Sequence, residues 1–396
     1  MRILHTSDWH LGRSFHGEGL GDAHARYLDH LVELTRAEKV DAVVVSGDIY
    51  DRALPNPRTV ELLDDALVRL LDTASRVVVT SGNHDSATRL GFGSRVMEHS
   101  GLHIRAAYEG IARPIAIPRL GSQDTAGHVV ALPYLEPSVA AGRFDTESTH
   151  RAVLTEAVTR GRTALPDDGL PVVGMAHAFF AGATTSESER DICVGGLGVA
   201  PRSVVDAFDY AALGHLHGAQ TLSESVRYSG SPVAMSFSEA AHTKGTWLVD
   251  VARGRVSAEF IEAPIHRSLA ILRGELDNLL ADPKLEHAES AWCQVTLTDE
   301  IRPAAAMERV RARFPHTLRL IFDTPRTEAQ PITYAERLKG RDDVELCCDF
   351  LAHVRGGRGP NATERTAIGK AVSAALRRGD EPMADDGSMF SLEDLR

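Results

Sequence analysis

The run AVVVS at residues 42–46 places the strongest constraint on the fold of this chain. Consecutive valines without polar alternation are typical of a parallel strand that is buried on both faces. A similar run, RVVVTS, occupies residues 76–81, and a helical pattern over residues 57–72 lies between the two. A first strand at residues 2–7 and a helix over residues 24–38 precede them, so that strands and helices alternate. This alternation predicts a layered α/β domain.

Each of the first three predicted strands ends in glycine or serine and side chains that can bind metals, and two later strands lead into histidines. The first three strands lead into DWHLG, GDIYD and GNHD, and two later strands, VVGMA and YAAL, lead into a histidine and into GHLHG. Ligand sites in open α/β sheets lie beyond the carboxyl ends of the strands. The residues at these five ends are Asp8, His10, Asp48, Asn83, His84, His177, His215 and His217. Together they predict a dinuclear metal site, and carboxylates with imidazoles suit Mn, Fe or Zn better than Ca.

The spacing also suggests separate tasks for these residues. Asp48 is the central carboxylate and can give one oxygen to each ion, whereas His215 and His217 point the same way from an extended segment and reach neighbouring ions. Two cations about 3.5–4 Å apart can bind both the attacking and the leaving oxygen of a phosphoryl transfer. His84 directly follows a ligand residue, so we expect it to face the substrate as a general acid, with Asp85 holding its other nitrogen.

The composition indicates the cellular compartment of the protein but says little about its binding partners. The chain has 396 residues, enough for two or three domains, and its formal net charge of −12 does not exclude a local nucleic-acid site. Four cysteines without a C-x-x-C pair, and no apolar signal or membrane segment, favour a cytoplasmic protein with free thiols. The glycine-rich stretch at residues 195–198 opens no helical pattern, so we interpret it as a flexible loop.

The second half of the chain divides into smaller parts. Extended pieces at residues 226–230, 246–251 and 255–261 are expected to complete a second sheet, and Pro264 marks a boundary. A small α+β unit, a polar linker, a helical pair and an acidic, disordered tail follow. The predicted divisions fall at residues 1–265, 266–325, 326–342, 343–378 and 379–396.

The helical pair is amphipathic, and Asn361 and Glu364 have capping-box spacing at the start of its second helix. Two short helices alone bury little surface and are marginal in water. We therefore expect the pair to dock on the helices of a partner. The alternative is that it folds back onto its own small domain.

The stretches DWHLG, GDIYD, GNHD, GMAH and GHLH resemble the calcineurin-like metallophosphoesterase superfamily. HTSDWHLG and RYSGSP resemble its DNA-repair branch, the nuclease subunits of bacterial SbcCD-type complexes. The resemblance implies two β-sheets flanked by helices, a DNA-binding capping domain at residues 266–325, and a helical pair that binds the coiled-coil base of SbcC, an SMC-like ATPase subunit. It also implies a homodimer within a heterotetramer, for which residues 57–72 and 90–99 are the candidate contacts. The alternative is that the apolar side chains of residues 90–99 pack on their own sheet.

The resemblance assigns roles to the strand-end residues. It implies that Asp8, His10, Asp48 and His217 hold one Mn²⁺ ion, that Asp48, Asn83, His177 and His215 hold the other, and that His84, supported by Asp85, is the catalytic acid. Mg²⁺ or another divalent cation is an alternative metal, and ATP enters only through the partner subunit. Asp51 stands where some relatives carry a phosphate-handling histidine, so it receives no firm role. A carboxylate that caps the next helix is an equally good interpretation.

The expected function is that of a Mn-dependent DNA nuclease in recombination, replication and repair. By the resemblance it would trim double-stranded ends 3′ to 5′, nick single strands and open hairpins. A phosphomonoesterase or cyclic-nucleotide phosphodiesterase on the same metal core is the alternative enzyme, and a non-catalytic DNA-end-binding scaffold is the alternative of another class. Residues beyond about 265, which a small-molecule phosphatase does not need, favour the nuclease, and an intact His84 argues against the scaffold.

Overall fold

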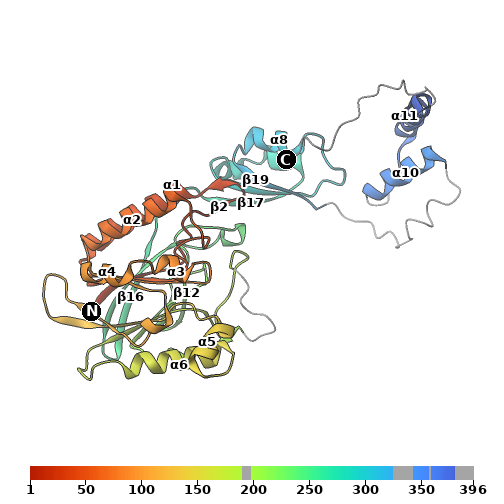
Figure 1. Cartoon of the computed structure of the whole chain (residues 1–396). Helices are drawn as coiled ribbons and strands as arrows, with labels where there is room; N and C mark the ends of the chain where they lie inside the picture. Colours follow the sequence, from red (N-terminus) through yellow and green to blue (C-terminus); the bar gives the residue numbers. More distant parts are fainter. Residues whose placement is uncertain (190–197, 324–341, 356–357, 380–396) are drawn as a thin grey trace, which may run out of the picture. The chain divides into compact units, whose positions relative to one another are not determined.

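The computed structural model describes residues 1–189, 198–323, 342–355 and 358–379 (Figure 1). All but one residue of the predicted linker, all but one residue of the acidic tail and most of the glycine-rich stretch lie outside the described residues. Internal contacts divide the chain into two units, one of Met1–Ile271 with Ser290–Cys293 and the other of Leu272–Glu289 with Gln294–Arg396. Within the described part of the chain, no helix has the length and apolar character needed to cross a membrane.

The first of two six-stranded sheets contains the opening strand of the chain. Its order is β16–β15–β1–β4–β5–β6, in which β1, β4, β5 and β6 are parallel and β15 runs antiparallel to both β1 and β16. The strands are β1 (Arg2–Thr6), β4 (Ala42–Ser46), β5 (Arg76–Thr80), β6 (Leu102–Arg105), β15 (Gly245–Ala252) and β16 (Arg255–Glu262). The prediction that residues 246–251 and 255–261 complete the second sheet is therefore wrong. They extend the open edge of β1, a choice between sheet edges that a local pattern does not reveal.

The second sheet has the order β13–β14–β12–β9–β8–β7. Its four inner strands are parallel, and the edge strands β7 and β13 run antiparallel to their neighbours. The strands are β7 (Ile115–Pro118), β8 (Thr125–Ala131), β9 (Val172–His177), β12 (Tyr210–Gly214), β13 (Gln220–Ser223) and β14 (Val226–Tyr228).

The two sheets pack face to face, as strand β4 illustrates. Successive side chains of a strand face opposite sides of the sheet. Val43 and Val45 pack with residues of the flanking helices, whereas Ala42 and Val44 pack with residues of the second sheet. A valine run is thus buried on both faces because one face meets helices and the other meets a sheet. The predicted layered α/β fold is confirmed.

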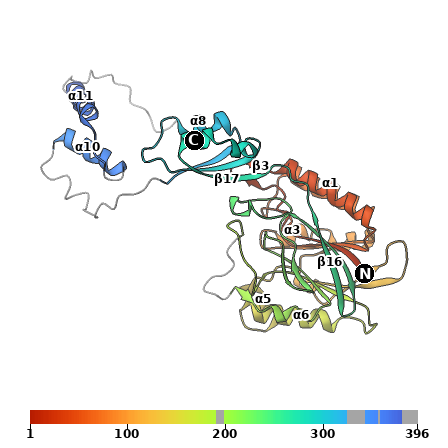
Figure 2. The ribbon, with the colours of Figure 1, turned by 180° about the vertical axis from the view of Figure 1, so that it is seen from behind.

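Two helices pack on the outer face of each sheet, as Figure 1 shows. On the first sheet these are α1 (Gly21–Glu38) and α2 (Pro57–Leu71), and on the second they are α5 (Pro137–Phe144) and α6 (His150–Thr163). Figure 2 shows α1, α5 and α6 from behind. Helix α2 begins where the Asn56 side chain accepts the backbone N–H of Thr59 at 3.0 Å. Asn56, rather than Asp51, therefore caps this helix.

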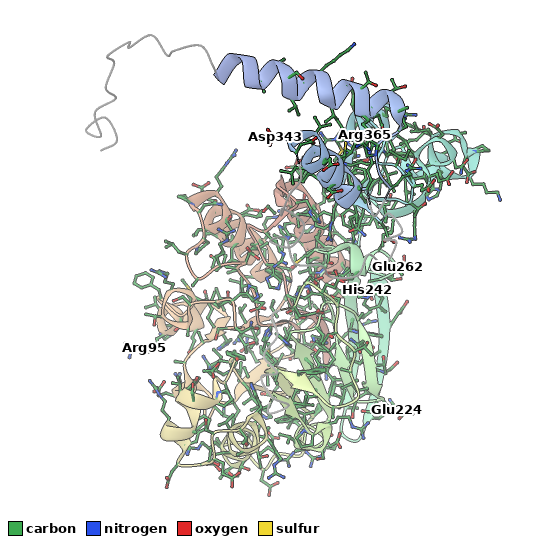
Figure 3. The ribbon with its side chains drawn as sticks, turned by 90° about the vertical axis from the view of Figure 1, so that its right-hand side faces the viewer. Arg95, Glu224, His242, Glu262, Asp343 and Arg365 are labelled. Carbon is green, nitrogen blue, oxygen red and sulfur yellow. The ribbon has the colours of Figure 1, made fainter. Side chains whose placement is uncertain are left out.

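Residues 90–99 form no single helix. Helix α3 (Ala87–Leu90) and helix α4 (Ser94–Met97) are separated by a turn in which Gly93 has a φ of 73°. Arg95, labelled in Figure 3, marks α4. Leu90 is buried, whereas Phe92 and Val96 are exposed. Shorter elements of this unit are β2 (Ser14–Phe15), β3 (Glu18–Gly19), β10 (Phe179–Phe180) and β11 (Val199–Ala200), with 3-10 turns at Glu98–Ser100, Tyr108–Gly110, Arg202–Val204 and Phe237–Glu239.

The small α+β unit contains a three-stranded sheet in the order β17–β18–β19. Its elements are β17 (Leu269–Gly274), α7 (Leu276–Ala281), a 3-10 helix at Pro283–Ala288, β18 (Trp292–Leu297), α8 (Ala306–Arg313) and β19 (Thr317–Phe322). Helices α10 (Asp343–Val354) and α11 (Ala362–Gly379) follow and contact each other. Figure 3 labels one residue of each, Asp343 and Arg365.

The predicted capping box at the start of α11 is confirmed. The side chain of Asn361 accepts the backbone N–H of Glu364 at 2.9 Å, and the Glu364 carboxylate accepts the backbone N–H of Asn361 at 2.9 Å. Such reciprocal bonds satisfy two N–H groups that have no partner within the helix. The helix therefore starts where the sequence predicts.

Candidate metal centre

The five ligand-bearing strand ends meet at one edge of the paired sheets. Strand β4 of the first sheet contacts both β9 and β12 of the second, which brings their carboxyl ends together. Seven of the eight predicted residues are buried, with exposed fractions of 6% or less, and Asn83 is partly exposed. A buried polar cluster of this size requires internal partners, because isolated polar groups are costly to remove from water.

Asp48 occupies the centre of the cluster. Its Oδ2 lies 3.5 Å from Nε2 of His10 and 3.4 Å from Nε2 of His177, so one oxygen faces imidazoles from both sheets. Its Oδ1 accepts the backbone N–H of His84 at 2.8 Å. Among the residues that the structure describes, three overlapping groups have ligand atoms within 4.8 Å of one another: Asp8, His10 and His217; His10, Asp48 and His84; and Asp8, Asp48 and His177. Asp48 belongs to two of these groups, and its Oδ2 is the oxygen that faces imidazoles from both sheets.

Several nitrogens and oxygens of the cluster face each other in the way that ligands of a shared cation do. Nε2 of His10 lies 3.1 Å from Nε2 of His217. Oδ1 of Asn83 lies 3.0 Å from Nε2 of His177 and 3.3 Å from Nδ1 of His215. Two neutral imidazoles that present lone pairs to each other are satisfied by a cation between them. The donor set of imidazole nitrogens, carboxylates and one amide oxygen fits divalent transition metals such as Mn, Fe or Zn.

Without a cation, several residues of the cluster have pKa values far from their usual range. Burial raises the pKa of Asp8 to about 6, although nearby histidines oppose the shift. Burial lowers the pKa of His215 to about 3. For His177 burial also disfavours the charged form, but the carboxylates of Asp48 and Asp8 and the bond to the carbonyl of Ser46 together outweigh it and raise the pKa to about 9. Metal ligands must be deprotonated, so we expect metal binding here to release protons.

Four of the eight residues have backbone conformations that side chains other than glycine rarely adopt. The φ angles are 53° at Asp8, 45° at His10, 51° at Asp48 and 104° at His215. Backbone hydrogen bonds hold the loops in these conformations, including those from Asp8 N to Gly47 O at 3.1 Å and from His10 N to Asp48 O at 2.9 Å. Strained residues of this kind cluster at functional sites. The strain here coincides with the candidate ligands.

Two glycines are required by close approach rather than by flexibility. A Cβ atom on Gly82 would lie 2.1 Å from Oδ1 of Asp48, and one on Gly214 would lie 1.8 Å from the carbonyl oxygen of Ser46. Any larger residue would displace the central carboxylate or separate the two sheets. The glycines that flank the predicted ligands thus allow the strand ends to converge.

Comparison with known families supports this interpretation of the site. The sequence profile of the calcineurin-like phosphoesterases matches residues 1–218. The chain belongs to this family. A second profile, described as the type 5 capsule protein repressor C-terminal domain, matches residues 266–355. The two matches identify the chain as a metallophosphoesterase of the SbcD type, in agreement with the predicted resemblance.

Solved structures add little to this assignment. The chain is similar to a dimetal phosphatase from Danio rerio, with 14% identity, 67% of this chain and 97% of that chain covered, and a TM-score of 0.35. It is also similar to a β-glucosidase from Exiguobacterium marinum, with 9% identity, 82% and 89% of the two chains covered, and a TM-score of 0.22. At these TM-scores neither likeness bears on the function of the phosphoesterase.

Asp85 supports the phosphoesterase site differently from the expectation. Its carboxylate accepts the backbone N–H groups of Ile49 at 3.1 Å, Tyr50 at 2.9 Å and Gly82 at 2.9 Å, so it joins the loops that follow β4 and β5. Burial and the nearby Asp48 raise its pKa to about 7. Nδ1 of His84 lies 2.8 Å from the backbone carbonyl of Asp51, which therefore takes the bond that we expected Asp85 to make.

The side chain of Asp51 faces the site. Its Oδ1 is 2.9 Å from Nη1 of Arg13 and 3.8 Å from Nδ1 of His10, a buried nitrogen that has no hydrogen-bond partner among the described residues. Arg13 was not singled out in the sequence. Nothing local distinguishes it from a surface arginine, because its partner lies far along the chain in the loop after β4.

Sequence reasoning also missed a group of residues around His217. These are Ser188, Glu189, Glu239 and Lys244, all within hydrogen-bond reach of this histidine or of one another. Burial disfavours the charged form of Glu239, but its bond toward His217 and the charge of Lys244 prevail and lower its pKa to about 2. These residues lie in irregular segments, where neither periodicity nor strand ends identify them. The one available signal was the position of Glu239 and Lys244 shortly after the RYSGSP stretch, which fixes no contact, and Ser188 and Glu189 lie before that stretch.

Proposed function

We propose that this chain is the nuclease subunit of an SbcCD-type complex. It would act as a Mn²⁺-dependent 3′–5′ exonuclease on double-stranded DNA and as an endonuclease on single strands and hairpins, in DNA recombination, replication and repair. One observation carries the proposal: a buried cluster of candidate metal ligands in a phosphoesterase domain is followed in the same chain by an SbcD-type domain at residues 266–355. A small-molecule phosphomonoesterase or cyclic-nucleotide phosphodiesterase needs only the first of these.

The geometry supports a division of the ligands between two ions. Asp8, His10 and His217 form one compact group, in which the two imidazole nitrogens face each other, and Asn83 lies between His177 and His215. Asp48 lies between these two groups. We therefore assign one ion to Asp8, His10, Asp48 and His217, and the other to Asp48, Asn83, His177 and His215.

The bound ions would supply the charge that stabilises the attacking and leaving oxygens of a phosphodiester. Transfer of a proton to the leaving group would be performed by a side chain of the protein. Nδ1 of His84 donates to the carbonyl of Asp51, which turns Nε2 toward the cluster, 3.9 Å from Oδ2 of Asp48. A protonated Nε2 in this position can give its proton to the leaving alkoxide of the DNA strand. His84 therefore fits the role of general acid.

The other parts of the chain fit a larger assembly. We assign residues 266–325 to a capping domain that binds DNA and the helical pair at residues 343–378 to the docking of SbcC, through which ATP would act. Phe350 and Val354 of α10 have exposed fractions of 58% and 64%. Large apolar side chains left in water on an amphipathic helix favour a partner surface.

A second exposed apolar group supports a homodimer within a heterotetramer. Leu54, Phe92 and Val96 have exposed fractions of 71%, 82% and 75%. Val68 of α2, within the other predicted contact segment, is 54% exposed. Leu90 is buried and is therefore removed from the predicted contact.

The test compares two substrates in parallel. Purified full-length protein is incubated with Mn²⁺ and either end-labelled hairpin DNA or a chromogenic phosphomonoester, with a chelator control for each. Cleavage of the hairpin is expected. Turnover of the phosphomonoester alone would replace the proposal with the small-molecule phosphatase, and stable DNA-end binding without cleavage would replace it with a scaffold.

A further inference from the structure

Three polar groups of His217, namely its backbone N–H, its backbone carbonyl and its ring nitrogen Nδ1, have partners in two segments that are distant in the sequence. Its backbone N–H donates to Oε1 of Glu189 at 2.8 Å, and its backbone carbonyl accepts from Nζ of Lys244 at 2.8 Å. Its ring nitrogen Nδ1 lies 2.7 Å from Oγ of Ser188. None of these partners is a candidate metal ligand. They contact His217 on the side away from the cluster, and we call these partners, with Glu239, the support of His217.

Glu239 is the centre of this support. It is 1% exposed, and its Oε1 accepts the hydroxyl of Ser188 and lies 3.5 Å from Nδ1 of His217. Its Oε2 is paired with the ammonium group of Lys244 and accepts the backbone N–H of Met235 at 3.3 Å. A buried charge is tolerated when it is paired and hydrogen-bonded. The lysine thus keeps Glu239 as a carboxylate, which can only accept hydrogen bonds.

The hydrogen count then determines the form of the imidazole. Ser188 has one hydroxyl hydrogen and gives it to Glu239, so its oxygen must accept from Nδ1 of His217. His217 is therefore the tautomer with hydrogen on Nδ1. This leaves the lone pair of Nε2 directed at the cluster, where Nε2 of His10 is 3.1 Å away.

We infer that Ser188 and Glu239 are positioning residues that hold His217 in its metal-binding tautomer and orientation, and so set the affinity of one ion but not of the other. The inference rests on the proposed metal assignment. His177, which is assigned to the other ion, has a different partner at its ring nitrogen Nδ1. Its Nδ1 lies 2.9 Å from the backbone carbonyl of Ser46, a support that involves no carboxylate or serine side chain. The two ions are therefore held by supports of different chemistry.

Mn²⁺ binding tests the inference without any measurement of activity. Titration calorimetry on the full-length, metal-free protein compares the original chain with Ser188→Ala, Ser188→Thr and Glu239→Gln. Loss of such an outer partner typically weakens metal affinity about 10–100-fold. We expect this loss at one of two sites in Ser188→Ala and Glu239→Gln, an unchanged second site, and recovery in Ser188→Thr, which keeps the hydroxyl. Asp168→Asn is the matched control, because Asp168 pairs with His128 at 2.7 Å but contacts no proposed ligand.

A second measurement reads the tautomer itself. Nitrogen-15 NMR of the metal-free protein should show His217 with hydrogen on Nδ1, and the resonance should change in Ser188→Ala. Unchanged affinities in Ser188→Ala would overturn the inference, as would equal weakening at both sites together with lower thermal stability, which indicates a purely structural role. If the original chain bound no Mn²⁺, the proposed function would fail together with the inference. If it bound two ions and Ser188→Ala also bound both tightly, only the inference would fail.

Discussion

Removal of His84 and removal of Asp48 should abolish activity for different reasons. General acid–base groups contribute about 10²–10⁴-fold in rate, which corresponds to about 3–5 kcal/mol of transition-state stabilisation. In His84→Ala the backbone N–H of residue 84 still donates to Oδ1 of Asp48, because that 2.8 Å bond involves no side-chain atom of the histidine. The central carboxylate therefore keeps its orientation, and we expect two bound Mn²⁺ ions with little nuclease activity.

Asp48→Ala has the opposite consequence. It removes the oxygen that lies 3.5 Å from His10 and 3.4 Å from His177, so both halves of the cluster lose their shared anion. What remains around each proposed ion is one carboxylate at most, with imidazoles and an amide. We expect Asp48→Ala to bind Mn²⁺ weakly at both sites, and to be inactive for that reason.

Calorimetry with Mn²⁺ and cleavage of end-labelled hairpin DNA, run on the same preparations, separate the two cases. His99→Ala, which removes an exposed imidazole on the same domain, is the matched control and should behave as the original chain in both assays. Loss of Mn²⁺ binding in His84→Ala would refute this division of roles, because it would make His84 a ligand. Full activity in His84→Ala would refute the general-acid role itself.

Three further predictions concern other parts of the chain. Phe92→Glu places a charge on a side chain that is 82% exposed, so it should give a folded monomer in light scattering, and a variant that stays dimeric would remove this segment from the interface. A chain cut at Thr324 should keep Mn-dependent activity on short DNA but lose co-purification with SbcC and stimulation by ATP, and undiminished partner binding would refute the docking role of the helical pair. Burial lowers the pKa of His5 from 6.5 to about 3, so between these values the unfolded chain binds a proton that the folded chain does not. The free energy of unfolding should therefore fall as pH drops from 6.5, by at most about 1.4 kcal/mol per unit from this group. Urea unfolding at pH 7 and pH 5 should show a smaller fall in His5→Gln, and an equal fall in both chains would exclude His5 as the source.

The parts that sequence analysis predicted are those in which local pattern and chemistry agree. Valine runs predict strands buried on both faces, and the polar residues after them meet because parallel strands share one carboxyl edge. The capping box of Asn361 and Glu364 was equally local, and the structure contains both of its bonds. Each of these features depends on neighbours in the chain.

Features that depend on distant segments were missed or misplaced. Nothing in the sequence of β15 and β16 distinguishes one sheet from the other, and only tertiary pairing places β15 beside β1 and β16 beside β15 rather than in the second sheet. Ser188 and Glu239 support His217 from irregular segments whose residues have no periodic pattern. The predicted contact between Asp85 and the ring of His84 was wrong for a related reason. A carboxylate next to a catalytic histidine suggests a partner for its ring, but backbone N–H groups of a neighbouring loop reach it instead.

The left-handed backbone at Asp8, His10, Asp48 and His215 also limits how stable this protein can become. Each such residue costs of order 1 kcal/mol or more relative to a relaxed conformation. Glycine would remove that cost at every one of the four positions, but it would also remove a candidate ligand. Selection for stability and selection for metal binding therefore oppose each other at the same four residues, and the folded chain remains less stable than its architecture allows.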